Sequence, residues 1–402
     1  MSNASAIKET VYYKAETAQI FAPIIALAQN AANDLPAAVA EKQKLAHNLF
    51  MQYGVPYPKL ERWKYSNFYP ILKKMDLAPA ALTDIWHGDL SFVKPIKDMV
   101  SEQWVQDLLC ATAPQSDEIK DDNAFWYLND LHNVQGWVID IPANTSVDQS
   151  LLLKTMSKDN TYNAERILIR VGRNARLVMD EQHQHEKNDH AYFKNWVTQI
   201  VLEDNAELVH TRNQNDSLKA AYVQNTAVTL GRDARYYGLT INKGAHMFRN
   251  QYHIVFEGEG AHASVRSSAD VGADQHIDLT TCMYHNVKSC TSDQIVRNVL
   301  HDKATGVFQG KVYVAKGADY TDGSQSSKAL LLSPLASMHA KPELEIYADE
   351  VKCAHGATCG AMDEKSLFYA RSRGIPYEDA RAMLVAAFLE EVKDGLPLTT
   401  GE

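Results

Sequence analysis

The stretch Lys341 to Gly360, KPELEIYADEVKCAHGATCG, decides how this chain is organised. It begins as an extended run in which apolar residues are interleaved with charged ones, as a half-buried strand requires: Leu344, Ile346, Ala348 and Val351. Cys353 and His355 follow two residues apart, so a continuing strand presents both side chains on one face. We expect a turn at Gly356 and helices after it, so the segment either binds something or closes a β-domain.

Upstream of this stretch, from about residue 123, strand-like runs such as GWVIDI, ERILIRV and YHIVF alternate with turns rich in Gly, Asn and Asp. A turn followed by a small residue recurs, with alanines at 175, 206, 234, 261 and 304, and the first three gaps are 31, 28 and 27 residues. Near-equal spacing without a helical period predicts a β-solenoid or β-helix over residues 123–360. An antiparallel sandwich is the alternative.

Residues 1–122 are expected to form an N-terminal helical region. A helix is predicted over 37–53, after Pro36 and before Gly54, with Val39, Leu45 and Phe50 near one face. An aromatic group follows, which we interpret as a packing anchor, with a binding surface as the alternative: Trp63, Tyr65, Phe68 and Tyr69.

Residues 361–402 are expected to form a C-terminal helical region, in which one helix stops at Gly374 and a second opens at Pro376. The second helix carries an apolar stripe: Ala380, Met383, Leu384, Ala387, Phe388 and Val392. We expect the stripe to pack on its own domain, with a partner protein as the alternative.

The composition excludes several classes of protein. The chain has 402 residues, enough for two or three domains, and its net charge of −10 with no Lys/Arg-rich run argues against a nucleic-acid surface. We find no signal-peptide pattern and no apolar stretch approaching the ~18 residues of a spanning helix. Five cysteines are too few for a disulfide framework, so we expect a soluble cytoplasmic protein.

Cys353, His355 and Cys359 form a C-x-H-x3-C pattern of soft metal ligands. Three ligands do not complete a structural zinc site, which requires four. Cys282 and Cys290 could contribute only if the fold brings them near, and a free cysteine is otherwise a small buried apolar residue.

A second group of metal-ligand residues lies in EQHQHEKNDH: His183, His185, Glu186 and His190. His-x-His on a strand could chelate a metal as in cupin-type barrels. The polar residues that follow indicate a solvated hairpin, so we interpret the stretch as a surface loop and keep a cupin-like metalloprotein as an alternative.

Three regions resemble the SufB/SufD family, the scaffold subunits of the SUF iron–sulfur cluster assembly system. They are the run from SSKALLLSPLASMHAKPELEIYADEVKCAHGATCG into the last helix, the upstream CTSDQIVRNVLHDKATGVFQGKVYVAKGADYTDGSQ, and the N-terminal ERWKYSNF. Cys353-Ala354-His355-Gly356 has the SufD form, where the SufB form resembles Glu-His-Glu-Ala.

The resemblance implies a right-handed parallel β-helix flanked by helices, and a non-catalytic role. It implies that the chain pairs with SufB through the β-helix ends and binds the ATPase SufC through its C-terminal helices, with Phe368, Met383, Leu384 and Phe388 as candidate contacts. The absence of a GxxxxGK[ST] motif fits ATP hydrolysis by the partner. An isolated chain could also pair with a second copy of itself.

The resemblance also implies that His355, and with it Cys353, contributes to a nascent iron–sulfur cluster at the interface with SufB, and that the isolated chain binds no cofactor tightly. Cys359 stands where the family has a small apolar residue, so no family role carries over to it. The alternative is a metal-dependent or carbohydrate-acting β-helix enzyme, although no ladder of exposed Asp, Lys or Arg is readable in the sequence.

Overall fold

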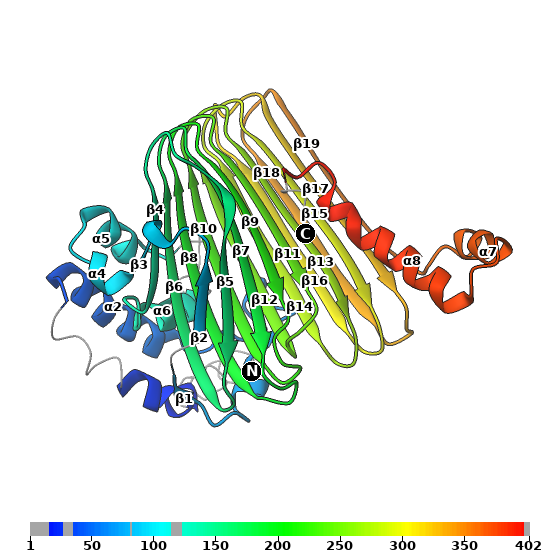
Figure 1. The fold of residues 1–402 in the computed structure, drawn as a ribbon, viewed down its shortest axis with the longest axis horizontal. Coiled ribbons are helices and arrows are strands. Elements are labelled where there is room, and N and C mark those ends of the chain that lie inside the picture. The colour runs from blue at the N-terminus through cyan, green and yellow to red at the C-terminus, as the bar shows by residue number, and fades with distance from the viewer. Residues whose placement is uncertain (1–15, 27–34, 81–82, 114–122, 398–402) are drawn as a thin grey trace, which may run out of the picture.

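The computed structural model describes residues 16–26, 35–80, 83–113 and 123–397. Its body is a long stack of strands with helices at both ends (Figure 1). Consecutive strands from β4 to β19 alternate between two sheets, and each pairs with the strand two positions away in the chain. One coil of the chain therefore contributes one strand to each sheet.

The two sheets contain ten and nine strands in the part of the chain that the structure describes. Sheet A is made of β1 (Ala78–Pro79), β3 (Val93–Pro95), β4 (Gly136–Ile141), β6 (Thr161–Val171), β8 (Tyr192–Leu202), β10 (Ala221–Leu230), β12 (Met247–Phe256), β14 (His276–His285), β16 (Thr305–Val314) and β18 (Ser337–Ile346). Sheet B is made of β2 (Thr83–His87), β5 (Ser146–Ser157), β7 (Arg176–His185), β9 (Glu207–Gln214), β11 (Arg235–Asn242), β13 (His262–Val271), β15 (Thr291–Leu300), β17 (Thr321–Leu331) and β19 (Val351–Gly360).

All pairings between successive coils are parallel. Ala221 of β10, for example, pairs with Phe193 of β8 on one side and with Met247 of β12 on the other. In-register parallel pairing places equivalent residues of each coil in columns, and alternate side chains point into the space between the sheets, here called the lumen. The predicted β-helix is thereby confirmed, and the antiparallel sandwich is excluded.

The repeating alanines occupy one corner of the coils. Ala175, Ala206, Ala234 and Ala261 are all buried at the turn that leads into a strand of sheet B. A residue with positive φ precedes each of them: Asn174, Asn205, Asp233 and Gly260. Asn, Asp and Gly tolerate this left-handed conformation best, which explains the turn composition.

The fifth alanine of the repeat does not belong to that corner. Ala304 leads into β16 of sheet A, at the opposite corner, so the recurring turn-plus-alanine pattern marks both corners of the coils. The next coil instead places Cys290 there, where it is fully buried and again follows a positive-φ residue, Ser289. A thiol takes the place of the alanine methyl because both are small and apolar.

The N-terminal region covers the outer face of sheet A (Figure 1). Its helices are α2 (Ala37–Tyr53), α3 (Tyr69–Leu72), α4 (Ile96–Met99), α5 (Gln103–Cys110) and α6 (Ala124–Asp130), with the short 3-10 turns η2 (Glu61–Trp63) and η3 (Leu90–Phe92). The predicted helix 37–53 is confirmed. Leu45 is nevertheless 52% exposed, and Ala46 lies on the buried face in its place.

The aromatic group after α2 packs as predicted. Trp63, Phe68 and Tyr69 are buried, and together with Phe125 of α6 they reach Phe193 on sheet A, whose ring centroid lies 5.4 Å from that of Phe125. Strands and helices mix near the expected boundary at 122/123, since β2 and β3 precede it and α6 follows it. The two regions share this apolar core, so the boundary does not separate two independent units.

The two ends of the β-helix differ. At the first end, β2 pairs antiparallel with β5 and β3 pairs antiparallel with β4, so extra strands cover both edges. At the last end, β18 and β19 are the outer strands, and the described part of the chain supplies no strand beyond them. The last coil therefore presents unpaired backbone groups at an open end.

The C-terminal segment forms an arm of α7 (Glu364–Ser372), α8 (Tyr377–Glu390) and the 3-10 turn η5 (Glu391–Lys393). Only the end of the arm near η5 lies against sheet B, and α7 projects away from the body (Figure 1). Asp363 caps α7 by accepting hydrogen bonds from the backbone N–H groups of Lys365 and Ser366. None of the described helices is long and apolar enough to cross a membrane.

Candidate functional site

Cys353 and His355 lie on β19, at the open end of the β-helix. In register, Cys353 pairs with Gly323 of β17 and His355 with Gln325. Gly323 and Gln325 are buried lumen residues, so Cys353 and His355 both face the lumen side. The prediction that they share one face of a strand is confirmed. Cys359 shares this face, because it pairs with the buried Ala329.

The expected turn at Gly356 is wrong. The stretch 341–360 folds as two strands on opposite sheets, β18 and β19, and the chain turns between them at 347–350. Gly356 lies in the middle of β19, and the strand continues to Gly360. The turn falls at Ala348-Asp349-Glu350, where the sequence offers no glycine to mark it.

The thiol of Cys353 is half-buried at the rim of the lumen. It packs against an apolar cluster that includes Val312 and Val314 of β16 and Leu344 of β18. Burial raises the pKa of the Cys353 thiol above its ordinary value, because burial disfavours the charged thiolate. His355, by contrast, is exposed.

Two glutamines lie below His355 in the lumen. Gln325 is 3% exposed, and neither the oxygen nor the nitrogen of its side-chain amide is hydrogen-bonded to any described residue. Gln294, its in-register neighbour on β15, accepts a hydrogen bond from the hydroxyl of Thr281, but its amide nitrogen has no partner in the described chain. The floor of the open end is thus polar and incompletely hydrogen-bonded.

The described residues contain no group of three or more His, Cys, Asp or Glu side chains placed to hold a metal ion. Cys353, His355 and Cys359 therefore do not make a complete site within the described chain. Cys282 and Cys290 are not brought to them. Cys282 lies on the outer face of sheet A against Arg62, and the thiol of Cys290 donates to backbone oxygens at its corner, 3.4 Å from Gly258 O.

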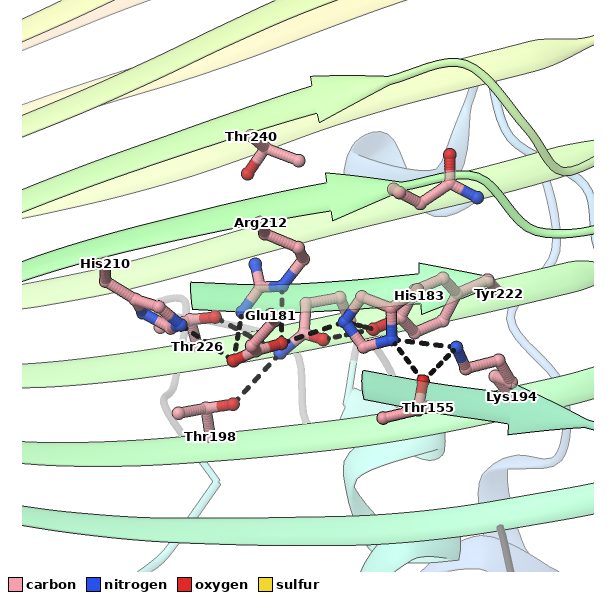
Figure 2. A network of polar contacts seen from close by, with 12 residues as sticks. Thr155, Glu181, His183, Lys194, Thr198, His210, Arg212, Tyr222, Thr226 and Thr240 are labelled. Atoms are coloured by element: carbon pink, nitrogen blue, oxygen red, sulfur yellow. Dashed lines mark hydrogen bonds and ion pairs between the residues drawn. The ribbon is translucent and has the colours of Figure 1, made fainter. Parts of the chain in front are cut away.

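The second group of metal-ligand residues is not a site either. His183 and His185 lie on β7 rather than in a loop, so the surface-loop interpretation is wrong for them, while 186–190 does form the connection to β8. His183 is fully buried in the lumen, and both ring nitrogens are engaged. Nδ1 lies 3.0 Å from the hydroxyl of Thr155 and 2.9 Å from Lys194, and Nε2 lies 2.9 Å from Glu181 (Figure 2).

Glu181 is the centre of this lumen network. Its carboxylate accepts from Arg212 at 3.0 Å and meets His210 at 2.7 Å and His183 at 2.9 Å (Figure 2). Burial would raise the pKa of Glu181, but the charges of Arg212 and His210 and the histidine hydrogen bonds outweigh it and hold the pKa well below its usual range. Burial and then the charge of Lys194 lower the pKa of His183 to about 4. These satisfied groups fix the lumen packing of the early coils.

A polar cluster that the sequence did not reveal pins the N-terminal segment to sheet A. The hydroxyl of Ser66 donates to Asp278 and lies 2.9 Å from Nε2 of His276. Arg249 pairs with Asp278 and stacks over the ring of Trp63, 4.1 Å from its centroid. Ser66 and His276 are 210 positions apart in the chain, and only the resemblance of ERWKYSNF to the family indicated that the segment matters.

The apolar stripe of α8 and η5 packs only in part, whereas the sequence led us to expect that it packs on its own domain. Of its members, only Ala380 and Val392 are buried, while Leu384 and Phe388 are half-buried and Met383 is 57% exposed. On α7, Phe368 is 74% exposed and Tyr369 is 61% exposed.

A groove of about 510 Å³ separates one flank of α8 from sheet B. It lies between Leu389 and Arg381 on the helix and Ile241 of β11 and Lys243, which follows that strand. The arm thus offers apolar surface without a partner in the described chain.

The chain matches a family model over residues 154–388, described as the SufBD core domain of SUF system FeS cluster assembly. It is 31% identical over 286 residues to an iron–sulfur cluster assembly SufBD family protein of Synechocystis, a match that covers 69% of this chain and 63% of that protein. It is 34% identical over 209 residues to the iron–sulfur cluster assembly protein SufD of Escherichia coli, covering 52% of this chain and 49% of that protein.

The iron–sulfur cluster assembly protein SufD of Bacillus subtilis is 29% identical over 208 residues, or 51% of this chain and 47% of that protein. The matches thus span about half to just under two thirds of the length of these relatives. The family model covers more than half of the chain and includes all coils from β6 to β19. This chain therefore belongs to the SufBD core family of the SUF system and is of the SufD type.

Proposed function

We propose that this chain is a non-catalytic scaffold subunit of a SufBCD complex, in which it takes part in assembling iron–sulfur clusters. In this proposal it pairs with SufB through the open end of the β-helix and binds the SufC ATPase through the arm. The observation that carries the proposal is that Cys353 and His355 lie at the lumen rim of an uncovered β-helix end.

The open end has the properties of an interface. Unpaired strand edges pair readily with another chain unless something covers them, and the first end of this β-helix is covered whereas the last is not. Large apolar side chains beside the open end are exposed, Tyr347 at 60% and Leu335 at 65%. A second β-helix stacked on β18 and β19 would satisfy the backbone groups and bury these side chains.

The cluster is the cargo of this interface. Thiolate and imidazole are ligands suited to iron in such clusters, and Cys353 and His355 point the same way from one strand. Two or three donors are fewer than a cluster needs, so SufB supplies the rest. Iron binding would deprotonate Cys353, because a cation stabilises the thiolate over the buried thiol.

The arm is proposed to dock on SufC. Phe368, Met383, Leu384 and Phe388 provide exposed or half-exposed apolar contacts on a segment that reaches away from the body (Figure 1). Exposed apolar groups concentrated on one projecting element mark an interaction site. Since the sequence contains no P-loop, ATP hydrolysis in the complex falls to SufC. Five free cysteines support a reducing, cytoplasmic setting for the complex.

The test of the cluster site uses the full chain co-expressed with SufB and SufC. His355→Ala should leave the complex intact on size exclusion but reduce the cluster absorbance after anaerobic reconstitution at least several-fold. His339→Ala is the matched control, because His339 lies on the outer face of the preceding strand β18, on the opposite sheet, where its ring is stacked 4.7 Å from Tyr65. Equal cluster yield from His355→Ala and the unmodified chain would refute the site.

The test of the arm is a SufC pull-down. Met383→Ser should weaken capture of SufC strongly, with an unchanged circular dichroism spectrum, since the side chain is 57% exposed and contributes little to folding. Glu378→Ser is the control, because Glu378 is also exposed but lies on another side of α8. A loss of capture in both variants, or in neither, would contradict docking through the apolar side.

A further inference from the structure

Gln325 is a buried amide without a partner. Among the described residues it is the one buried side-chain amide for which neither the oxygen nor the nitrogen is hydrogen-bonded. Gln224, which lies deeper in the lumen, is satisfied at both ends of its amide: its oxygen accepts from Tyr222 at 2.6 Å and its nitrogen donates to Thr198 at 3.2 Å. Because desolvating an amide without replacing its hydrogen bonds is unfavourable, the position of Gln325 requires a physical reason.

Gln325 lies directly beneath His355. The two residues are in register on the adjacent parallel strands β17 and β19, and such strands are separated by ~4.8 Å. Both side chains project to the lumen side, so the amide can reach the imidazole ring. The unpartnered amide is thus a buried polar group one strand below the exposed histidine and in register with it.

The fold leaves space for this amide. Gly310 faces it from β16, and a Cβ atom there would lie 2.8 Å from Nε2 of Gln325 and 2.9 Å from Oε1 of Gln294. Any larger residue at 310 would force both amides to move. The glycine therefore leaves room for the two amides beside the ring of Phe308.

We propose that Gln325 is the positioning residue of the His355 site. Its side-chain oxygen accepts a hydrogen bond from one ring N–H of His355 when the site is loaded, and this leaves the other ring nitrogen free to bind iron. Histidines that bind metals almost always donate their second nitrogen to an acceptor of this kind, which fixes the tautomer and the orientation of the ring. The inference rests on the proposed function, because it assigns a role at the same site.

The alternative is that ordered water alone satisfies the amide. Water would remove the cost of burial but would leave His355 and its ligand unaffected by the identity of residue 325. The two explanations therefore differ in metal affinity and in the spectrum of the bound metal.

The experiment titrates Co²⁺, as a spectroscopic substitute for iron, into the complex of the full chain with SufB and SufC. Gln325→Met keeps the length of the side chain but removes the acceptor, and we expect Co²⁺ to bind about 10- to 100-fold more weakly, with shifted absorption bands. Gln325→Glu retains an acceptor oxygen and should restore both the affinity and the bands. Gln294→Met, the same substitution one coil deeper, should leave both unchanged.

The outcomes distinguish a failure of the proposed His355 site from a failure of the positioning role of Gln325. If His355→Ala binds Co²⁺ as the unmodified complex does, the proposed site itself is wrong, and the inference fails with it. If His355→Ala abolishes binding while Gln325→Met has no effect, the site stands and only the positioning role is overturned. If Gln325→Met weakens binding and Gln325→Glu does not restore it, the side chain acts by packing and the inference is again overturned. Should Gln325→Met not fold, Gln325→Asn, which withdraws the oxygen by one methylene, replaces it with the same expectation.

Discussion

The carboxylate of Glu391 lies 2.7 Å from Nε of Arg297, and this ion pair ties the C-terminal arm to β15. Lys328 of β17 reaches the same carboxylate at 3.2 Å. Arg266 of β13 adds hydrogen bonds to the backbone oxygens of Val392, at 3.2 Å, and Asp394. Three cations on successive strands of sheet B therefore hold η5, while the rest of the arm projects beyond them (Figure 1).

Glu391→Gln should loosen this anchor. The carboxylate is 39% exposed, so solvent screening limits the loss to roughly 0.5–1 kcal/mol, which corresponds to about two- to five-fold faster hydrogen exchange in η5 and the last turn of α8. Exchange in the coils of the body should not change. Glu390→Gln is the control, since Glu390 pairs only within the arm, with Lys393 at 3.1 Å. Equal acceleration in both variants would show that the contact with Arg297 is not the anchor.

Breaking the lumen network at Glu181 should destabilise the fold strongly. Glu181→Leu leaves the fully buried Arg212 without its carboxylate, and loss of one partner of a buried ion pair costs about 3–5 kcal/mol. The double variant Glu181→Leu/Arg212→Met removes both charges and should be less destabilised than Glu181→Leu alone. Denaturant unfolding of the unmodified chain, the two single variants Glu181→Leu and Arg212→Met, and the double variant measures the coupling energy between the two residues. Additive losses of unfolding free energy would mean that the pair does not interact.

Buried histidines should make the protein less stable as the pH falls. Burial lowers the pKa of His285 to about 4, so between pH 6.5 and 4 the unfolded chain binds a proton that the folded chain does not. The contribution of His285 is therefore fully present above pH 6.5 and is lost by roughly 1.4 kcal/mol per pH unit on going down to pH 4. His285→Asn should flatten the dependence of the unfolding free energy on pH by this slope. An unchanged slope in His285→Asn would contradict the prediction.

Gly310→Ala should disturb the open end from inside. The new Cβ atom would lie 2.5 Å from the ring of Phe308 as well as against the amides of Gln325 and Gln294, and overpacking of this kind costs about 1–3 kcal/mol. Gly356→Ala is the matched control, because no atom lies within 4 Å of its added Cβ, and its effect should stay within about 0.5 kcal/mol. Thermal unfolding compares the two variants. Equal midpoint temperatures for Gly310→Ala and Gly356→Ala would show that the lumen beside Gly310 accommodates a methyl group without strain.

Periodicity and composition predicted the architecture well. Alternating strand patterns, turn residues and regularly spaced alanines are local features, so they predicted a β-helix with helices at both ends. The spacing of Cys353 and His355 likewise placed both on one face of a strand, because side-chain alternation depends only on the backbone.

The sequence was ambiguous or misleading where one local pattern has two structural explanations. Ala304 has the same turn signature as the other alanines but lies at the opposite corner, since both corners favour small residues. The polar sequence around His183 resembles a loop, yet His183 is buried in the lumen, where Glu181, Thr155 and Lys194 satisfy it. Local polarity does not show whether distant residues supply hydrogen bonds.

The sequence by itself determined the coil period, the strand face that carries Cys353 and His355, and the helical nature of the arm. Only the tertiary structure decided that β19 is an outer strand, that one end is covered and the other open, and that Gln325 lies beneath His355. The physical reason is register. Gln325 and His355 are thirty positions apart in the chain, and the stacking of one complete coil on the next brings them to adjacent strands. The register of this stacking depends on the combined contacts of all corners and lumen residues, which no short stretch of sequence reveals.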